Sequence, residues 1–417
     1  MTIAKNTRAW QSALFDALLF GVIFGLTNVI SYGFIVMTGR SLKPADYGTF
    51  SALLGLISLG GVFANSIQAG ATQAVKTSTN TLKLHHVLSS AWKYSALGAA
   101  VLIAVLLPFK QQLNANTSQV ILGGLCLFAM IMSSAVVGYL AGIGKVRAQA
   151  DLACYGAIAR LATGWLLLTT GFGISGALGG YVINYLFIFV LAIIYNRSYT
   201  PQNNTKIASK TKNIKIETST LLIFMLTYAT FTLDQFAVQF FNPSVGGDYA
   251  AAATIAKLTF FTAFPVIAIA YPRMLTQTSR LAQLKTLRHA ATAIVASGTA
   301  LVIVLLIFPH EITTLFFGNQ FEMAAANIPI LALGVLFFSM SVLAMHAKIA
   351  WRYTAGYIPA AVLLGGGFLL HAYRHQDIGK IVENQTIIFG TQMLFLWASF
   401  ILNFNSASIS LHNANDS

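Results

Sequence analysis

The chain has 417 residues, of which 56% are hydrophobic and only 9% are charged, and its formal net charge is +14. Soluble domains carry about 25% charged residues, so this composition and a mean hydropathy of +0.71 exclude an ordinary soluble protein and indicate an integral membrane protein. The basic residues are scattered between apolar segments, which argues against a nucleic-acid partner. The two cysteines, Cys126 and Cys154, form no CxxC motif, and we expect no disulfide framework, no metal and no cofactor.

Apolar runs of about twenty residues recur along the chain. The first follows the basic segment MTIAKNTR, is too long for the core of a signal peptide and lacks a convincing A-x-A site, so we interpret it as a retained helix. Residues 152–195 can be divided in more than one way, because the turn GFGIS is short. The runs predict an all-α polytopic protein with about twelve transmembrane helices, at residues 12–37, 47–75, 88–108, 119–143, 152–171, 174–195, 218–241, 248–272, 290–309, 326–347, 353–372 and 386–404.

Lysine and arginine are distributed unevenly between the two sides of these helices. With the N-terminus in the cytoplasm, the outer loops hold five basic residues, Arg40, Lys43, Lys110, Arg374 and Lys380. The inner segments hold seventeen, Lys5, Arg8, Lys76, Lys83, Lys145, Arg147, Arg197, Lys206, Lys210, Lys212, Lys215, Arg273, Arg280, Lys285, Arg288, Lys348 and Arg352. Because cytoplasmic loops carry the excess of positive charge, we expect a multi-pass protein of the cell (inner) membrane with both termini in the cytoplasm.

A polar, basic segment divides the chain into two halves. It is RSYTPQNNTKIASKTKNIKIE, residues 197–217, and we expect it to be a cytoplasmic linker between an N-terminal six-helix lobe, 1–196, and a C-terminal six-helix lobe, 218–417. The halves also repeat one device: LKPADYGTFSALLGL follows the first helix and NPSVGGDYAAAATIAKL follows the seventh. In each, a turn with proline leads to Asp-Tyr and a small residue that opens the next helix. This predicts an internal six-helix repeat, as in many secondary transporters.

Four stretches resemble one family of membrane proteins. They are SLKPADYGTFSALLGL (41–56), GYLAGIGKVRAQADLACYGAIARLATG (138–164), GISGALGGYVINY (173–185), and LDQFAVQFFNPSVGGDYAAAATIAK (233–257) with the nearby YPRML (271–275). Their order and spacing resemble the polysaccharide (oligosaccharide) flippases of the multidrug/oligosaccharidyl-lipid/polysaccharide superfamily. The last third of the chain is similar to that family only in a general way.

The resemblance implies two six-helix lobes facing a central cavity. It implies a transporter, not an enzyme, that moves a lipid-linked oligosaccharide, usually on a polyprenyl pyrophosphate, from the cytoplasmic to the outer leaflet. The expected partners are that substrate and membrane lipids, and we expect a monomer. A sugar head group cannot cross hydrocarbon unaided because its polar groups would lose water without new partners. A polar groove supplies those partners, and rocking of the lobes gives alternating access.

Three charged residues within predicted helices are candidates for such a groove. Arg160 lies about eight residues into the fifth predicted helix, about 12 Å deep. Its guanidinium is suited to a pyrophosphate, or alternatively its side chain extends back to the cytoplasmic surface. Lys93 is shallower, and the surface interpretation is favoured over a cavity role. Asp16 lies near the inner end of the first helix and is a weak candidate for cation coupling, because acidic residues are common at that interface.

Asp234 and Lys257 are charged residues within two neighbouring apolar runs. Measured back from the turn that joins the runs, they lie about 12–14 Å deep. Adjacent helices joined by a short turn place them at similar depth, so we expect an ion pair that lowers the cost of burying either charge alone. Two roles remain open. The pair is purely structural, or it also lines the substrate cavity and opens during transport.

Two other functions are compatible with parts of this pattern. A cation-coupled multidrug or small-molecule antiporter of the same superfamily would share the fold, although acidic residues are sparse here. A membrane enzyme of glycan assembly, a polymerase or a ligase, usually needs a sizeable outer loop. The longest outer stretch, residues 310–327, is short and its only acidic residues are Glu311 and Glu322. A scaffold without transport activity also fits the sequence.

Overall fold

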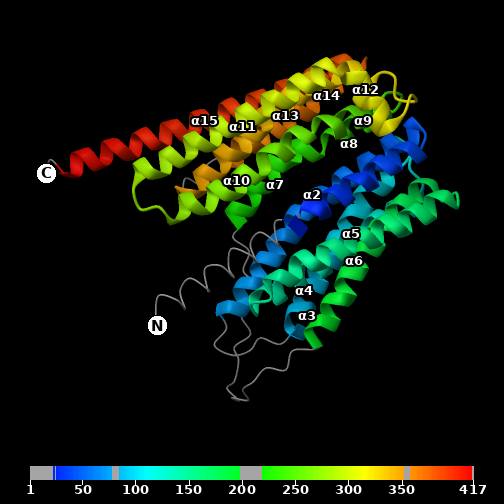
Figure 1. Cartoon of the computed structure of the whole chain (residues 1–417), viewed down its shortest axis with the longest axis horizontal. Coiled ribbons are helices and arrows are strands. Elements are labelled where there is room, and N and C mark those ends of the chain that lie inside the picture. Colours follow the sequence, from blue (N-terminus) through cyan, green and yellow to red (C-terminus); the bar gives the residue numbers. More distant parts are fainter. Residues whose placement is uncertain (1–21, 24, 78–83, 198–217, 352–356, 416–417) are drawn as a thin grey trace. The chain divides into compact units, whose positions relative to one another are not determined.

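A computed structural model describes residues 22–23, 25–77, 84–197, 218–351 and 357–415. Within these ranges every regular element is helical (Figure 1). The predicted fold class, an all-α polytopic membrane protein, is therefore confirmed. The first predicted helix, 12–37, is only partly described, and residues 25–41 are helical.

The helices follow the predicted spans closely. In the first half of the chain they are α2 (Pro44–Thr77), α3 (Leu84–Leu106), the short 3₁₀ turn η1 (Leu107–Phe109), α4 (Thr117–Gly142), α5 (Val146–Thr169) and α6 (Gly173–Arg197). In the second half they are α7 (Thr218–Thr232), α8 (Asp234–Phe241), α9 (Gly246–Ala256), α10 (Leu258–Thr276), α11 (Arg280–Ile307), α12 (Pro309–Phe317), α13 (Ala324–Ala350), α14 (Tyr357–Tyr373) and α15 (Ile378–Asn415).

Among the described residues, nine helices are long and apolar enough to cross a membrane. They are Pro44–Lys76, Leu84–Phe109, Thr117–Gly142, Ala148–Thr169, Gly173–Asn196, Gly246–Thr276, Arg280–Ile307, Ala324–Ala350 and Ile378–Asn403. Two shorter apolar helices, Leu222–Thr232 and Ala360–Tyr373, fall in predicted spans as well. Together with the partly described first helix, these elements fit the predicted number of about twelve.

The chain forms two compact units, each with its own packing. Unit 1 contains residues 1–42, 60–111 and 115–216, and unit 2 contains residues 43–59, 112–114 and 217–417. Helix α2 therefore contributes its first part to unit 2 and its second part to unit 1. Apart from Arg197 the predicted linker, 197–217, lies outside the described residues, and the lobe boundaries 1–196 and 218–417 stay a prediction.

Each unit is built around one deeply buried helix. In unit 1, α4 packs against α3 and α6, and α5 packs against α6. In unit 2, α13 packs against α9, α10, α11 and α15. Buried residues make up 72% of the most apolar stretch of α4 and the same share of α13. These helices are the fourth predicted span of the first half and the fourth of the second, as an internal repeat leads one to expect.

The two repeated Asp-Tyr motifs pack against each other within unit 2. The hydroxyl of Tyr47 lies 3.1 Å from that of Thr254, and both tyrosines of the repeat, Tyr47 and Tyr249, are fully buried. A Cβ atom added to Gly48 would lie 2.8 Å from the backbone nitrogen of Gly247, which is closer than real Cβ atoms approach. The glycines are thus required because the backbones of α2 and α9 come into direct contact, as small residues permit between membrane helices.

Candidate functional site

Asp234 and Lys257 form the expected ion pair in unit 2. The Nζ atom of Lys257 lies 2.9 Å from Oδ1 of Asp234, and the two side chains are 15% and 1% exposed, respectively. The hydroxyl of Tyr249 donates a hydrogen bond to the other carboxylate oxygen, Oδ2, over 3.1 Å. Both oxygens of this buried carboxylate therefore have a donor, as burial of a charge requires.

The sequence places both charges at breaks in the predicted helices. Predicted span 218–241 divides into α7 and α8 at Leu233, so that Asp234 opens α8. Predicted span 248–272 divides into α9 and α10 at Lys257. A carboxylate is favoured at a helix N-terminus and an ammonium at a helix C-terminus, because the backbone dipoles leave partial charges of opposite sign there. Asp234 thus lies at a helix end that favours its charge, whereas Lys257 lies between the C-terminus of α9 and the N-terminus of α10, whose opposite partial charges offset each other.

Aromatic rings complete the surroundings of Lys257. Its Nζ atom lies 4.8 Å from the centre of the Phe231 ring, which contributes a cation–π interaction. Phe231 in turn stacks on Phe338, with ring centres 4.3 Å apart and planes inclined by 11°. The Phe231 ring thus contacts one side of the Lys257 ammonium, and Asp234 contacts another. The position of the charge is therefore fixed from two sides.

A cavity of about 540 Å³ lies beside this pair, within unit 2. Helices α7, α8, α14 and α15 line it with mainly apolar residues. The polar exceptions are Thr230, Asp234, His371 and Gln385. His371 Nε2 lies 3.0 Å from Gln385 Oε1, and Gln385 Nε2 donates to the backbone oxygen of Thr230 over 2.8 Å. Because a carboxamide oxygen only accepts, Nε2 of His371 carries a proton.

His371 is a residue whose importance the sequence did not reveal. Its position near a helix end predicts a place at the membrane interface, but its side chain is only 3% exposed and packs inside unit 2. Its Nδ1 atom is buried and has no hydrogen-bond partner among the described residues. The sequence does carry one signal of a buried polar cluster. Gln385 and Gln392 lie seven residues apart in an apolar span and therefore on one helix face.

Arg160 is buried in unit 1 and does not extend to a surface. Helix α5 begins at Val146, six residues before the predicted start of the span at residue 152, so Arg160 lies near the middle of the helix. Its side chain is 7% exposed, and its Cζ atom lies 4.5 Å from the ring centre of Tyr181 and 5.2 Å from that of Phe34. Its Nε and Nη2 atoms are buried with no hydrogen-bond partner in the described part of the chain. The aromatic contacts hold the guanidinium in place and leave these donors unused.

The other two candidates do not join these groups. Lys93 is exposed on α3, between the exposed rings of Trp92 and Tyr94. Asp16 lies outside the described residues. Of the predicted site residues that the structure describes, Asp234 and Lys257 alone are brought together, and Arg160 and Lys93 belong to unit 1.

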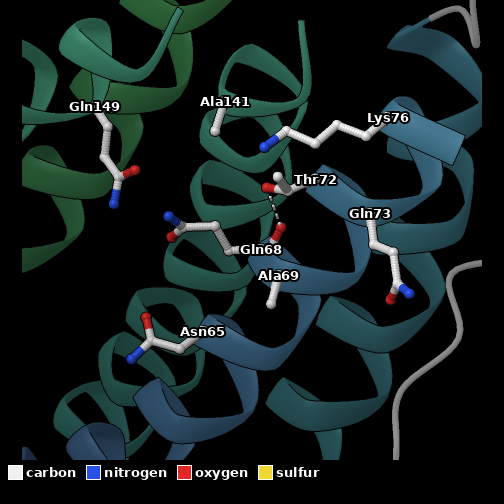
Figure 2. A pocket seen from close by; sticks show the side chains of 8 residues that line it. All are labelled: Asn65, Gln68, Ala69, Thr72, Gln73, Lys76, Ala141 and Gln149. Atoms are coloured by element: carbon white, nitrogen blue, oxygen red, sulfur yellow. Dashed lines mark hydrogen bonds between the residues drawn. The ribbon is translucent and has the colours of Figure 1, made fainter. Parts of the chain in front are cut away.

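A second cavity, of about 650 Å³, lies within unit 1 (Figure 2). Its lining is polar for a site between membrane helices, and one helix supplies most of it. The residues are Asn65, Gln68, Ala69, Thr72, Gln73 and Lys76 of α2, Ala141 of α4 and Gln149 of α5. We call this site the α2 pocket.

The α2 pocket was not among the sites predicted from the sequence. Its α2 residues lie at positions 65, 68, 69, 72, 73 and 76, and this pattern of i, i+3, i+4 and i+7 puts them on one face of a helix. A polar stripe with that period inside an apolar run is visible in the sequence without a structure. The charged residues alone do not predict this pocket, because most of its polar groups are uncharged carboxamides.

Comparisons with known proteins identify the fold. No family model matches the chain, and no curated protein matches its sequence. Among solved structures, the lipid II flippase MurJ in an inward closed conformation aligns with a TM-score of 0.73 and 13% identity, over 93% of this chain and 87% of that one. An inward-facing multidrug resistance MATE family transporter of the MOP superfamily aligns with a TM-score of 0.66 and 12% identity, over 93% and 95%. A mutant of the Vibrio cholerae MATE transporter VcmN aligns with a TM-score of 0.58 and 15% identity, over 94% and 98%. The chain thus shares the fold of these transporters.

Proposed function

We propose that this protein is a membrane transporter that flips a lipid-linked oligosaccharide, a glycan on a polyprenyl pyrophosphate, from the cytoplasmic to the outer leaflet for polysaccharide biosynthesis. The two lobes, 1–196 and 218–417, alternate access to the substrate by moving against each other, and the 197–217 linker joins them in the cytoplasm. No covalent step takes part, so the protein is not an enzyme.

The observation that carries this proposal is the fold that the chain shares with a lipid flippase. The alignment with the lipid II flippase MurJ has a TM-score of 0.73 and spans most of both chains. That neighbour is named for a lipid-borne substrate, and the resemblance of four sequence stretches to oligosaccharide flippases points to the same substrate class.

The polar groups of unit 1 fit the demands of such a substrate. A glycan head group loses its water when it enters a membrane protein and needs replacement hydrogen bonds. The α2 pocket offers carboxamides from two helices, and Arg160 adds a buried guanidinium with unused donors. A guanidinium matches the geometry of phosphate oxygens. These are the groups that a sugar and its pyrophosphate require.

A cation-coupled multidrug antiporter is the second candidate, and the cavity of unit 2 is the observation in its favour. This cavity is largely apolar and contains one carboxylate, that of Asp234. An amphipathic cation would be expected to bind in such a cavity. However, Lys257 and Tyr249 already engage both oxygens of Asp234, so a drug cation would have to displace a tethered ammonium. We therefore favour the flippase.

Reconstitution of the full-length protein into liposomes tests the proposal. The vesicles contain an undecaprenyl-pyrophosphate-linked oligosaccharide, and a glycan-oxidising enzyme added outside reports how much of the glycan is accessible. In protein-free vesicles only the outer leaflet, about 50% of the glycan, is accessible. With the protein present, we expect the accessible fraction to rise towards all of the glycan. A fraction equal to that of protein-free vesicles, together with uptake of ethidium driven by a sodium or proton gradient, would replace the flippase by the antiporter.

A further inference from the structure

The α2 pocket contains polar side chains with no partner among the described residues. The carboxamides of Asn65, Gln68 and Gln149 and the ammonium of Lys76 make no hydrogen bond or ion pair with any other residue in the part of the chain that the structure describes. Thr72 differs, because its hydroxyl lies 2.9 Å from the backbone oxygens of both Gln68 and Gly138 and is committed to the α2–α4 contact. Asn65 and Lys76 are exposed, and Gln68 and Gln149 are half-buried, so these groups are free to bind a partner that enters the pocket from outside the protein.

Figure 2 shows how these side chains lie. Asn65, Gln68 and Lys76 extend from α2 towards the side where Ala141 and Gln149 lie, on α4 and α5. The side chains thus approach one space from two different helices, and a ligand there would be held from both sides.

The chemistry of the lining defines the ligand. A carboxamide offers two donors and an acceptor on one flat group, and sugar hydroxyls and acetamido groups both donate and accept. Among the described residues the lining includes no acidic side chain, and Lys76 is the one charged group. A lipophilic cation would meet repulsion from this ammonium, and a sugar with carboxylates would need more than one cation.

From this lining we infer that the α2 pocket is the binding site for uncharged sugars of the transported glycan, with Lys76 facing the phosphate beside them. The inference rests on the proposed function, since it names the sugar class that the flippase accepts. The volume of about 650 Å³ lies in the range of about 300–1,000 Å³ that small-ligand sites occupy, so the pocket holds a short part of a glycan.

Binding of three soluble probes to the full-length protein in detergent tests the inference. The probes are farnesyl pyrophosphate, farnesyl pyrophosphate linked to N-acetylglucosamine, and farnesyl pyrophosphate linked to glucuronic acid. Intrinsic tryptophan fluorescence gives each Kd. We expect the N-acetylglucosamine probe to bind about tenfold more tightly than the bare pyrophosphate, and the glucuronic acid probe to gain much less.

Substitutions then show which residues give the N-acetylglucosamine probe its higher affinity. In the double variant Gln68→Leu/Gln149→Leu the advantage of the neutral sugar should disappear, about a tenfold loss for two hydrogen-bonding groups, while the bare pyrophosphate binds as before and shows that the protein is folded. Lys76→Gln should weaken all three probes by a similar factor. Gln111→Leu is the control, because it makes the same chemical change on an exposed residue that precedes the N-terminal end of α4. Ala141 of the pocket lies near the other end of α4. This variant should therefore bind all three probes as the wild type does.

Two outcomes would overturn the inference alone, and a third would overturn the proposed function as well. If the Gln68→Leu/Gln149→Leu variant keeps the full advantage of the neutral sugar, the sugar binds elsewhere. If the wild type prefers glucuronic acid, the assigned sugar class is wrong. Either result leaves the proposed function standing as long as flipping occurs in liposomes. An absence of flipping, with no binding of any probe, removes the proposed function and this inference together.

Discussion

Lys257 places its ammonium 2.9 Å from the carboxylate of Asp234 and 4.8 Å from the ring centre of Phe231, in the middle of two broken apolar helices. Each charge alone would be expensive in this setting, because ionised groups are stabilised far less in an apolar interior than in water. The pairing, the Tyr249 hydroxyl and the N-terminus of α8 at Asp234 together make burial tolerable. The remaining question is whether the pair also takes part in transport.

Removing one charge of the pair should be more harmful than removing both. Asp234→Asn and Lys257→Met each leave the other charge without a partner, and we expect each to lower the free energy of unfolding by about 3–5 kcal/mol. The double variant should recover much of this loss. Thermal unfolding in detergent and protein abundance in the membrane measure the effect.

The same variants separate the two roles of the pair. If the double variant recovers both abundance and glycan export, the pair is structural. If abundance returns but export does not, the pair belongs to the transport path. Single defects that simply add in the double variant would show that the two residues are not coupled energetically, contrary to the geometry.

The two tyrosines of the repeated motif should differ in importance. Tyr249→Phe removes a hydrogen bond to a charged carboxylate, of 3.1 Å, and should cost about 1.5–3 kcal/mol of unfolding free energy. Tyr47→Phe removes a bond of the same length to the neutral hydroxyl of Thr254 and should cost about 0.5–1.5 kcal/mol. Thermal unfolding of both variants compares them. A larger effect at Tyr47 would mean that the motif contact, rather than the charge, dominates.

How much the sequence predicted depends on the kind of signal. Apolar runs predicted the spans because a bilayer demands about twenty apolar residues per helix, and the depth of Asp234 and Lys257 predicted their pairing. The helix breaks at Leu233 and Lys257 were not predicted, because hydrophobicity continues through them. The burial of His371 depends on how α14 packs against α15, which no local pattern encodes. The α2 pocket could have been found from helical spacing.

Cysteine labelling tests the predicted orientation. In a variant with Cys126 and Cys154 replaced by alanine, cysteines at Lys110 and Ser244 should react with a membrane-impermeant maleimide added to intact cells. Ser244 is chosen because it is exposed, whereas Gly246, in the same turn, is buried and would bring an added Cβ atom into collision with the side-chain oxygen of Gln239.

A cysteine at Lys210, in the predicted cytoplasmic linker, should react only after the cells are opened. The physical reason is the excess of lysine and arginine in the inner segments. Labelling at residue 210 in intact cells would reverse the orientation and with it the direction of transport that we propose.

Arg160 is a second candidate, besides Lys76 of the α2 pocket, for contact with the anionic part of the substrate. Its Nε and Nη2 atoms have no hydrogen-bond partner among the described residues, while Tyr181 and Phe34 hold the guanidinium in place. Arg160→Ala should therefore abolish glycan export at normal protein abundance. Arg160→Lys should restore export only in part, because an ammonium lacks the planar fork that matches phosphate oxygens.

Lys93→Ala is the matched control for Arg160. It removes a positive charge from an exposed position of the same unit, and an exposed charge adds little to stability or to a buried site, so we expect export to stay within about twofold of the wild type. Export and abundance are measured together in cells that depend on the protein for their surface polysaccharide. Normal export by Arg160→Ala would mean that the guanidinium serves only the packing of Phe34 and Tyr181. A loss of abundance in step with export would lead to the same conclusion, since the cation–π contacts then stabilise the fold rather than the substrate.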